Sequence, residues 1–571
     1  MKVTSQVLSA GAAEAGFQKC LAAIAERRLV LRFWRKDLTL WPRLESRKDS
    51  AQLALDWLDL AAGLPDAVSR ISALAEKLGG IGIQDVVFLA TSISSKAAEL
   101  VLSLGLPTRG VRFHVLNRTE SPPLRALEKQ LDLGRTLFLV ASKTGKNLEM
   151  HALLLYFLSR VKSAGVVSPG ANFIAITEEG SYLYSLATEN HFQSVLREPH
   201  GFRGRFSGVQ HYGLLLCGLC GLPLAKILAQ LNATRSDCGR TEGIPENPAA
   251  KLAAFLAAIA QRGDYRLVFR SSEKLVPLAK RLAHLVGSST CKNDTGILPF
   301  LEVQVSSREP LKSKCSICDI SMHGEDPPKP LDPSIPRVAL EIDDLESIPA
   351  RVFEWEIATA LACSLLNVDP FEDPDDADGR DDAMQYIDQF SVNRHFSFSR
   401  PRITERGISL FVEGELRHDI SSLGLEHALA SVFALCGPDG YCLLMNYLWK
   451  VPAVRLSLTT CADRLGANLG VPVAVVPGPR YLHVLGQSYK AGPRGGIALM
   501  LTCDSSEKIE IPGAGYTFGD LEMALALGDF DAMNRRGRSI VRLHLTGTPD
   551  TAMAQLQELT DKALKLHTRS R

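Results

Sequence analysis

A short polar turn between an apolar segment and a helical pattern carries the residues best suited to chemistry in this chain. In TLFLVASKTGKNLEMHALLLYFL, which begins at Thr136, the apolar start predicts a buried strand and the end predicts a buried helix. The turn between them contains Ser142, Lys143, Thr144 and Gly145. Hydroxyls, an ammonium and the free N–H groups of a helix start favour a phosphate or a similar anion. Ordinary capping of the helix is the alternative.

Apolar segments that alternate with helical patterns must position this turn. In the first half they are VVFLA, LFLVA, NFIAI and YRLVF, and in the second half RVALEI, a strand near Tyr441, VPVAVV and GIALMLTCD. A long helix, FEWEIATALACSLL, separates the first two segments of the second half. Continuous apolar strands between helices are typical of parallel sheets covered on both faces. We therefore predict an α/β fold of two three-layer αβα domains with mainly parallel sheets and the active cleft between them.

The composition shifts suggest where these domains begin and end. We predict an N-terminal helical extension over residues 1–60, a first domain over 61–305 and a second domain with C-terminal helices over 337–571. Residues 306–336 are rich in Pro, Lys, Asp and Ser, which is typical of a linker or a surface excursion.

The overall charge excludes a global field that would attract nucleic acid or an anionic membrane. The 571 residues contain 64 Lys and Arg against 63 Asp and Glu. The N-terminus lacks a basic start with an apolar stretch, and no uncharged apolar run approaches the roughly 20 residues that span a bilayer. We expect a cytoplasmic protein with no nucleic-acid or membrane partner.

The cysteines give little sign of a metal site. Cys315 and Cys318 have the spacing of half a zinc site, but no second Cys/His pair of convincing spacing follows. Reduced thiols that pack as small apolar groups are the favoured interpretation.

Several motifs, in order along the chain, resemble one family. These are SKTGKNLEM, GRFS from Gly204, WEIATALACSLLNVDPFEDP from Trp355, and GPRYLHVLGQSYKAGP from Gly478. The chain resembles the glucose-6-phosphate isomerase family, built from two sugar-isomerase (SIS) domains, and is most similar to the isomerase half of bacterial transaldolase/glucose-6-phosphate isomerase fusions. This resemblance covers almost the whole chain, from Phe33 to Leu545.

The resemblance implies isomerisation of glucose 6-phosphate to fructose 6-phosphate, a step of glycolysis and gluconeogenesis, without a metal or organic cofactor. Such chemistry opens the sugar ring and moves a proton between two carbons through an enediolate. It requires an anion cradle, a carboxylate base and cationic groups. By resemblance, the ligand is a sugar phosphate or a related anion, and a homodimer is expected. The residues implied in substrate and phosphate binding are Ser94, Ser142, Lys143, Thr144, Lys146, Asn147, Gly204, Gln487 and Lys490.

The catalytic positions implied by the resemblance are partly altered. Arg205 matches the arginine that steadies the enediolate, and His483 is the candidate for ring opening because imidazole moves protons near neutral pH. Ser288 stands where the family has its catalytic glutamate, and a serine cannot act as that base without activation. Arg380 replaces the family lysine, within an acidic run that reads most simply as a solvated loop capping a helix.

Two hypotheses stay open at this point. The first is an active sugar-phosphate isomerase with a base from outside the aligned motif. The second is a catalytically inactive paralogue that binds a sugar phosphate and regulates or scaffolds other proteins. Fold alone does not decide between them.

Overall fold

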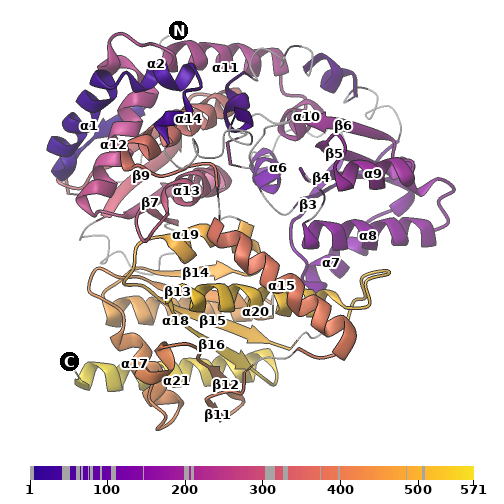
Figure 1. The fold of residues 1–571 in the computed structure, drawn as a ribbon. Helices are drawn as coiled ribbons and strands as arrows, with labels where there is room; N and C mark the ends of the chain where they lie inside the picture. Colours follow the sequence, from indigo (N-terminus) through magenta and orange to yellow (C-terminus); the bar gives the residue numbers. More distant parts are fainter. Residues whose placement is uncertain are drawn as a thin grey trace. The chain divides into compact units, whose positions relative to one another are not determined.

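The structure, a computed structural model, divides into two compact units (Figure 1). Unit 1 consists of Met1–Asn117, Leu127–Thr290 and Ser316–Glu372, and unit 2 of Arg118–Ala126, Cys291–Cys315 and Asp373–Arg571. The residues that the structure describes are 6–41, 52–59, 65, 68–74, 76, 82–90, 93–103, 111–143, 145, 147–198, 205–206, 211–301, 315–325, 332–372, 374–396, 399–449, 451–483, 485–504 and 508–570.

A five-stranded parallel sheet carries the predicted polar turn. Its strand order is β3-β2-β4-β5-β6. The strands are β2 (Asp85–Leu89), β3 (Arg112–Leu116), β4 (Thr136–Ala141), β5 (Phe173–Glu178) and β6 (Ser194–Glu198). The helices along this part of the chain are α6 (Ile93–Ser103), α7 (Ser121–Glu128), α8 (Leu148–Ser163) and α9 (Tyr182–Glu189), with short 3-10 turns η4 (Leu133–Arg135) and η5 (Pro169–Asn172). Every residue of β2 and β4 is buried, because helices cover both faces, as the apolar runs predict.

A second sheet has the order β1-β10-β9-β7-β8. Its strands are β1 (Gln6–Ser9), β7 (Arg266–Ser271), β8 (Leu298–Leu301), β9 (Cys315–Met322) and β10 (Arg337–Ile342). β9 and β10 are parallel, whereas β1 runs antiparallel to β10. The YRLVF segment, which forms β7, therefore lies in a different sheet from the other three apolar segments of the first half.

The helices of unit 1 outside the first sheet include two that are buried along most of their length. In α14 nearly every position is buried, and in α12 about two thirds are, as expected for helices packed on several sides. The elements are η1 (Gly11–Ala13), α1 (Glu14–Glu26), α2 (Leu29–Trp34), η2 (Leu38–Leu40), η3 (Gln52–Asp59), α10 (His211–Leu219), α11 (Leu224–Cys238), η6 (Ile244–Glu246), α12 (Pro248–Arg262), η7 (Glu273–Leu275), α13 (Val276–Thr290), η10 (Leu345–Ser347) and α14 (Ile348–Leu366).

The structure differs from the expected linker and second-domain start. Residues Cys315–Met322, inside the predicted linker at 306–336, form β9, whose first six residues are buried. β10, at the expected start of the second domain, pairs with β9 and belongs to unit 1. The surrounding Pro, Lys and Ser residues hide this strand in the sequence, because such residues are typical of loops. The boundaries at 61, 306 and 337 stay a prediction about domains.

Unit 2 is built on a six-stranded sheet with the order β11-β12-β16-β15-β13-β14. The strands are β11 (Ile403–Glu405), β12 (Ile408–Phe411), β13 (Cys442–Tyr447), β14 (Val473–Pro477), β15 (Ile497–Cys503) and β16 (Ser539–Leu545). β14, β13, β15 and β16 are parallel, and the β11–β12 hairpin adds an antiparallel edge. The predicted α/β class with mainly parallel sheets is confirmed.

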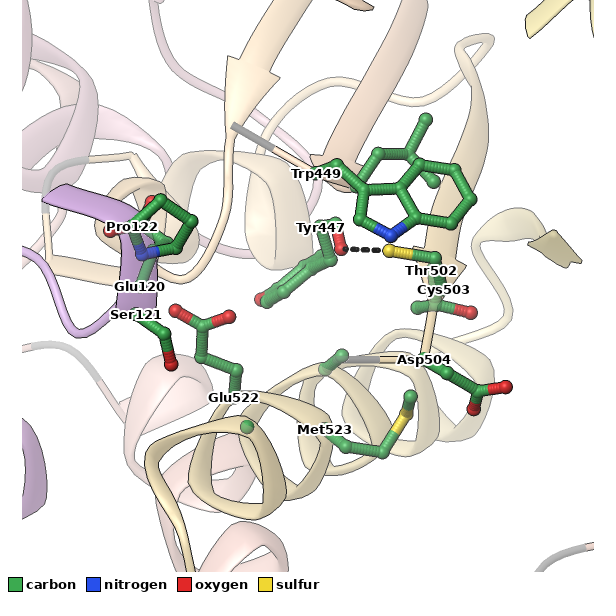
Figure 2. Close-up of a pocket in the computed structure, with 13 residues that line it drawn as sticks. Glu120, Ser121, Pro122, Tyr447, Trp449, Thr502, Cys503, Asp504, Glu522 and Met523 are labelled. Carbon is green, nitrogen blue, oxygen red and sulfur yellow. Dashed lines mark hydrogen bonds between the residues drawn. The ribbon is translucent and has the colours of Figure 1, made fainter. Parts of the chain in front are cut away.

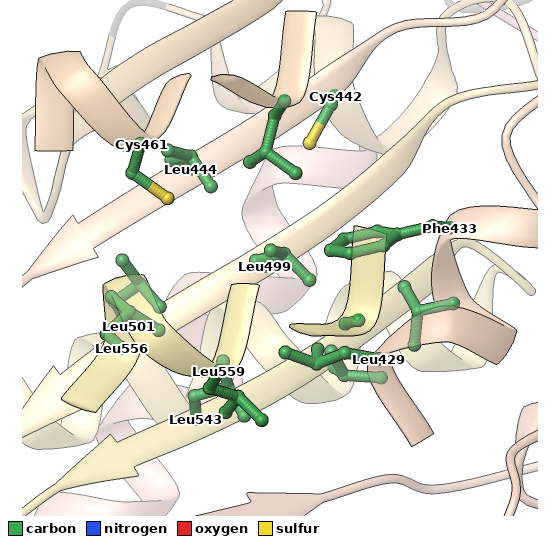
Figure 3. Packing of buried hydrophobic residues seen from close by; sticks show 14 of the residues in the cluster. Leu429, Phe433, Cys442, Leu444, Cys461, Leu499, Leu501, Leu543, Leu556 and Leu559 are labelled. Atoms are coloured by element: carbon green, nitrogen blue, oxygen red, sulfur yellow. The ribbon is translucent and has the colours of Figure 1, made fainter. Parts of the chain in front are cut away.

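A hydrophobic core cluster of unit 2 lies on one face of this sheet (Figure 3). Alternate residues of each strand point into it, such as Leu444 of β13, Leu499 of β15 and Leu543 of β16. Helices α17 (Leu425–Ala434), α18 (Pro452–Leu469) and α21 (Pro549–Ser570) cover that face. The other elements are α15 (Pro374–Asn393), α16 (Leu416–Asp419), η11 (Arg480–His483), α19 (Gly486–Ala491) and α20 (Phe518–Arg535).

Candidate functional site

The predicted anion turn follows the central strand β4 and precedes α8. The Ser142 hydroxyl accepts the N–H of Gly145 at 3.0 Å, and the Asn147 side chain caps α8 by accepting the N–H of Met150 at 2.9 Å. Gly145 has φ of +75°, and a Cβ there would lie 2.5 Å from the backbone nitrogen of Leu183. The turn therefore requires glycine at this position. Thr144 and Lys146 lie outside the described residues.

Lys143 is held at the side of this turn by the end of the neighbouring strand. Its Nζ lies 3.2 Å from Oε1 of Glu178, with 42% of the lysine side chain exposed. Its carbonyl accepts the N–H of Glu178 and, at 3.0 Å, the hydroxyl of Thr177. An anion at the turn would share this ammonium with the carboxylate of Glu178.

Arg205 is buried and binds backbone carbonyls that follow α14. Its Nε donates to the Ser289 hydroxyl at 2.9 Å, and its Nη2 donates to the carbonyls of Pro370 at 2.6 Å and Glu372 at 3.0 Å. The side chain of Phe371, within that loop, packs against Phe206 at a ring distance of 4.8 Å. The guanidinium thus ties the GRFS turn to α13 and to the DPFE loop. Gly204 lies outside the described residues.

Ser288 lies in the last turn of α13 and is 2% exposed. Its neighbours Ser289 and Thr290 are fully buried, and the Thr290 hydroxyl donates to the carbonyl of Val286 at 2.8 Å. The sequence has no carboxylate between Lys274 and Lys292. Ser288, which the resemblance predicts at the position of the family base, is therefore a buried hydroxyl.

A buried ion pair beside Arg205 was missed by the sequence analysis. Nη2 of Arg281, on α13, donates to Oε1 of Glu356 on α14 at 2.6 Å and to the carbonyl of Arg205 at 2.6 Å. The side chains of Arg281 and Glu356 are only 8% and 1% exposed. The signal was present as charged residues inside largely apolar helical patterns, where a buried charge is usually found only when it is paired.

Arg380 is an exposed residue of α15, in unit 2. The acidic run around it does not form the loop that the sequence suggested: it forms the first turns of this helix. Two carboxylates of the run form ion pairs. Asp378 pairs with Arg536, just after α20, and Asp382 pairs with Arg535, at the end of α20. Helix-to-helix ion pairs, rather than solvation alone, explain the run.

The motif from Gly478 to Pro493 forms η11 and α19, and its retained polar residues are buried. Gln487 Nε2 donates to the carbonyl of Cys291 at 3.2 Å, and Lys490 Nζ lies 2.5 Å from Oδ1 of Asp529. Both side chains are 1% exposed. Burial raises the pKa of Tyr489, which stands where the family has a second histidine. The side chains of His483 and of Ser94, on α6, lie outside the described residues.

Unit 2 has a narrow cavity at the carboxyl edge of its own sheet (Figure 2). Its volume is about 50 Å³, and it lies where the strand order reverses between β13 and β15. The lining includes Glu120, Tyr447, Trp449, Asp504 and Glu522. A wider cavity of about 330 Å³ shares Asp504 with it. No residue that the sequence analysis proposed for the site is among the lining residues described for either cavity.

The described residues hold no group of three or more His, Cys, Asp or Glu side chains that could bind a metal ion. Cys315 and Cys318 are both buried on β9, where residues three apart point to opposite faces of a strand. Among the helices of the described residues, none is long and apolar enough to cross a bilayer.

Three relatives resemble part of the chain. It is 28% identical over 229 residues to a probable glucose-6-phosphate isomerase of Natronomonas pharaonis, a match that covers 40% of this chain and 52% of that protein. It is 23% identical over 319 residues to one of Haloquadratum walsbyi, covering 49% and 73%. It is 25% identical over 190 residues to the glucose-6-phosphate isomerase of Thermus thermophilus, covering 33% and 44%. The chain thus spans about half the length of the first relative. The predicted resemblance to the glucose-6-phosphate isomerase family is confirmed over these parts of the chain.

Two solved structures share a distant likeness. A hypothetical protein from Thermus thermophilus has a TM-score of 0.44 at 16% identity, covering 98% of this chain and 93% of that one. A glucose-6-phosphate isomerase from Chlamydia trachomatis has a TM-score of 0.48 at 14% identity, covering 57% and 74%. No family model matches the chain. Neither structure is similar enough to transfer a residue's role to this protein.

Proposed function

We propose that this protein binds a sugar phosphate and interconverts its aldose and ketose forms, with glucose 6-phosphate and fructose 6-phosphate as the first pair to test. The observation that carries the proposal is the similarity to proteins named glucose-6-phosphate isomerase, at 28% identity over 229 residues for one of them. The position of the turn in unit 1 supports it, because Ser142, Gly145 and Asn147 build a strand-to-helix turn at the start of α8. Asn147 caps the N–H of Met150, so an anion would use the other N–H groups of the helix start.

The roles of individual residues are part of the proposal. The turn after β4 and the start of α6 bind the phosphate, Arg205 steadies the enediolate, and His483 opens the sugar ring. Arg380 supplies a second cation. The residues proposed for substrate and phosphate binding are Ser94, Ser142, Lys143, Thr144, Lys146, Asn147, Gly204, Gln487 and Lys490. No cofactor is required for these steps.

Ser288 makes the proton transfer the weakest step of the proposed reaction. Loss of a general base costs about 100-fold to 10,000-fold in rate. Turnover would therefore be slow, unless an acid from elsewhere in the protein serves as the base. The alternative function is an inactive paralogue that binds the sugar phosphate and regulates or scaffolds other proteins.

A coupled assay with fructose 6-phosphate at high protein concentration tests the proposal. Calorimetry with a phosphorylated sugar acid, which mimics the enediolate, measures binding in parallel. Ser288→Glu should raise the rate, while Ser288→Gln, which adds similar bulk without an acid, should not. Binding without turnover in all three proteins would support the inactive paralogue. Absence of both binding and turnover would overturn the proposal.

Cytoplasmic location, a homodimer and the lack of a nucleic-acid partner are also proposals. Cell fractionation, light scattering of the purified protein and a filter-binding assay with DNA and RNA test them in turn. A monomer by light scattering at micromolar concentration would contradict the homodimer.

A further inference from the structure

One carboxylate in unit 2 binds both ends of the segment that carries His483. Asp529, on α20, is 1% exposed. Its Oδ1 lies 2.5 Å from Nζ of Lys490, and its Oδ2 accepts a hydrogen bond from the phenol of Tyr481. Lys490 and Tyr481 are themselves only 1% and 4% exposed. Because Tyr481 is in η11 and Lys490 is in α19, the two contacts bracket His483 and Gln487 along the chain.

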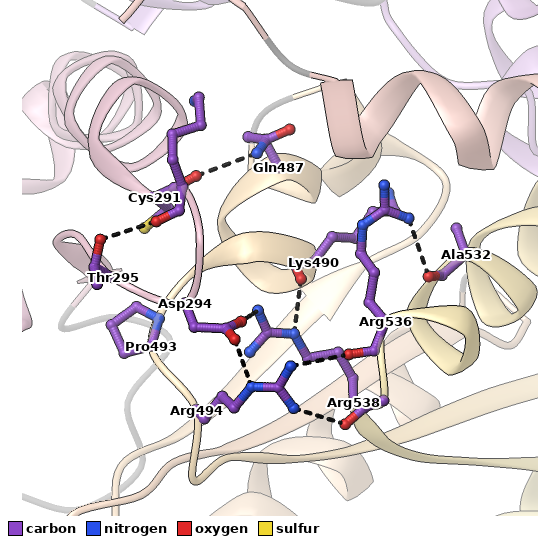
Figure 4. A network of polar contacts seen from close by, with 12 residues as sticks. Cys291, Asp294, Thr295, Gln487, Lys490, Pro493, Arg494, Ala532, Arg536 and Arg538 are labelled. Atoms are coloured by element: carbon purple, nitrogen blue, oxygen red, sulfur yellow. Dashed lines mark hydrogen bonds and ion pairs between the residues drawn. The ribbon is translucent and has the colours of Figure 1, made fainter. Parts of the chain in front are cut away.

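The backbone of this segment is held by further buried contacts (Figure 4). Gln487 Nε2 donates to the carbonyl of Cys291 at 3.2 Å, and Arg538 Nε donates to the carbonyl of Lys490 at 2.7 Å. Arg538 in turn donates to Asp294 at 2.7 Å. Side chain and backbone of Lys490 are thus both held by buried contacts, and Asp529 supplies the contact to the side chain.

The same carboxylate lies close to the helix that carries Arg380. A Cβ on Gly379 would lie 3.4 Å from both Cε and Nζ of Lys490. A Cβ on Gly528, the residue before Asp529, would lie 2.5 Å from the carbonyl oxygen of Gly379. The backbones of α15 and α20 therefore approach closely where Asp529 holds Lys490, and Arg380 is the next residue after this contact.

The charge pattern fits a positioning role. A buried ion pair contributes little net stability compared with apolar side chains of the same size, whereas it fixes geometry through directed bonds. The pKa of Tyr481 is raised, first by burial and then by the charge of Asp529, so its phenol keeps its proton and remains a donor. One carboxylate therefore contacts two side chains on different elements, Tyr481 through a hydrogen bond and Lys490 through an ion pair.

We infer that Asp529 is a positioning residue for the ring-opening step, acting through Tyr481 and Lys490 to orient the segment that carries His483. The inference rests on the proposed function, because His483 is the proposed ring-opening residue. It separates ring opening from the later proton transfer: a displaced His483 slows the reaction of a closed sugar much more than that of an open-chain sugar.

The test compares a ring-closed substrate with one that cannot close. Glucose 6-phosphate is mostly cyclic, whereas a four-carbon aldose 4-phosphate has its terminal oxygen esterified and stays open. Asp529→Asn keeps the shape and removes the charge, and Tyr481→Phe removes one donor and leaves the ion pair. Both should lower kcat/KM for glucose 6-phosphate by about 100-fold, as expected for a misplaced catalytic group. The loss with the open-chain substrate should be at least about tenfold smaller.

Asp531→Asn is the matched control, since Asp531 lies on the same helix and binds the hydroxyl of Tyr386 at 2.7 Å, outside the motif segment. It should leave both rates unchanged. Equal losses of kcat/KM with the two substrates would overturn the inference. So would an unchanged kcat/KM for glucose 6-phosphate in Asp529→Asn or in Tyr481→Phe. If Asp529→Asn does not fold, Tyr481→Phe still decides. If the unaltered protein converts neither of the two substrates, the proposed isomerase activity is refuted instead.

Discussion

Glu356→Gln should destabilise unit 1 strongly, although it only replaces one carboxylate oxygen with an amide nitrogen. At 2.6 Å, the attraction between Glu356 and Arg281 is about 6 kcal/mol at an effective dielectric constant of about 20. Desolvation of two buried ions costs several kcal/mol each, so the net contribution of the pair is close to zero. Removal of one partner is different, because the Arg281 guanidinium stays buried and loses its ion pair with Glu356.

The expected loss in unfolding free energy is about 3 kcal/mol, at the lower end of the range for broken buried pairs. The lower end applies because a glutamine oxygen can still accept one hydrogen bond, and Arg281 keeps its bond to the carbonyl of Arg205 at 2.6 Å. Urea unfolding followed by tryptophan fluorescence measures this loss. Of the five tryptophans only Trp449 lies in unit 2, so the signal reports mainly on unit 1.

An exposed pair in the same unit is the control. Glu179 lies 3.0 Å from Arg197 with 55% of its side chain exposed, so Glu179→Gln should cost less than about 1 kcal/mol. The double variant Arg281→Met with Glu356→Leu should recover part of the lost unfolding free energy, because both charges of this pair are then removed. A cost below about 1 kcal/mol for Glu356→Gln, or a double variant as costly as the sum of the singles, would refute the reasoning.

Three other outcomes are expected. Gly145→Ala should lower the thermal stability more than Gly165→Ala. Both glycines have positive φ, but only a Cβ at 145 would meet a neighbour, the backbone of Leu183. Equal losses of stability would show that the turn at Gly145 can rearrange to accept a Cβ. Burial raises the pKa of Asp531 to about 6, so the folded state holds this proton above the pH at which the unfolded chain releases it. Unfolding free energy should therefore fall as pH rises from about 4 to about 6, by roughly 1 kcal/mol after solvent screening, and the fall should be absent in Asp531→Asn. All twelve cysteines are buried, and burial raises the pKa of Cys217 to about 12. A disulfide reagent should therefore label no cysteine in the native protein and all twelve in denaturant. Rapid labelling of the native protein would contradict this packing.

The strands buried on both faces could be predicted from the sequence. β2, β4, β5, β13 and β15 appear as continuous apolar runs, and β15 is buried at every position. Such runs arise because helices on both sides exclude water from alternate residues of the strand. The local pattern therefore contains the information needed to find these elements.

Strand partners and sheet membership could not be predicted in the same way. β9 lies among Pro, Lys and Ser residues, and β7 joins a sheet with β9 and β10 rather than with β5. β1 pairs with β10 although more than half the chain separates them. These choices depend on packing between distant segments, and periodicity within one segment carries no record of it.

The contacts of the candidate site residues could not be predicted from the sequence either. A motif fixes residue type, yet Arg205 donates to the carbonyls of Pro370 and Glu372, and Lys490 pairs with Asp529. A buried cation that already has an acceptor can bind a ligand only if the ligand replaces that acceptor. The replaced acceptor then stays buried without the cation, which costs free energy. Retained residue types at these positions therefore argue as much for a held scaffold as for a ligand contact. What separates the two is whether substitution changes binding at unchanged stability, because a scaffold residue cannot lose its contacts without loosening the unit that it holds.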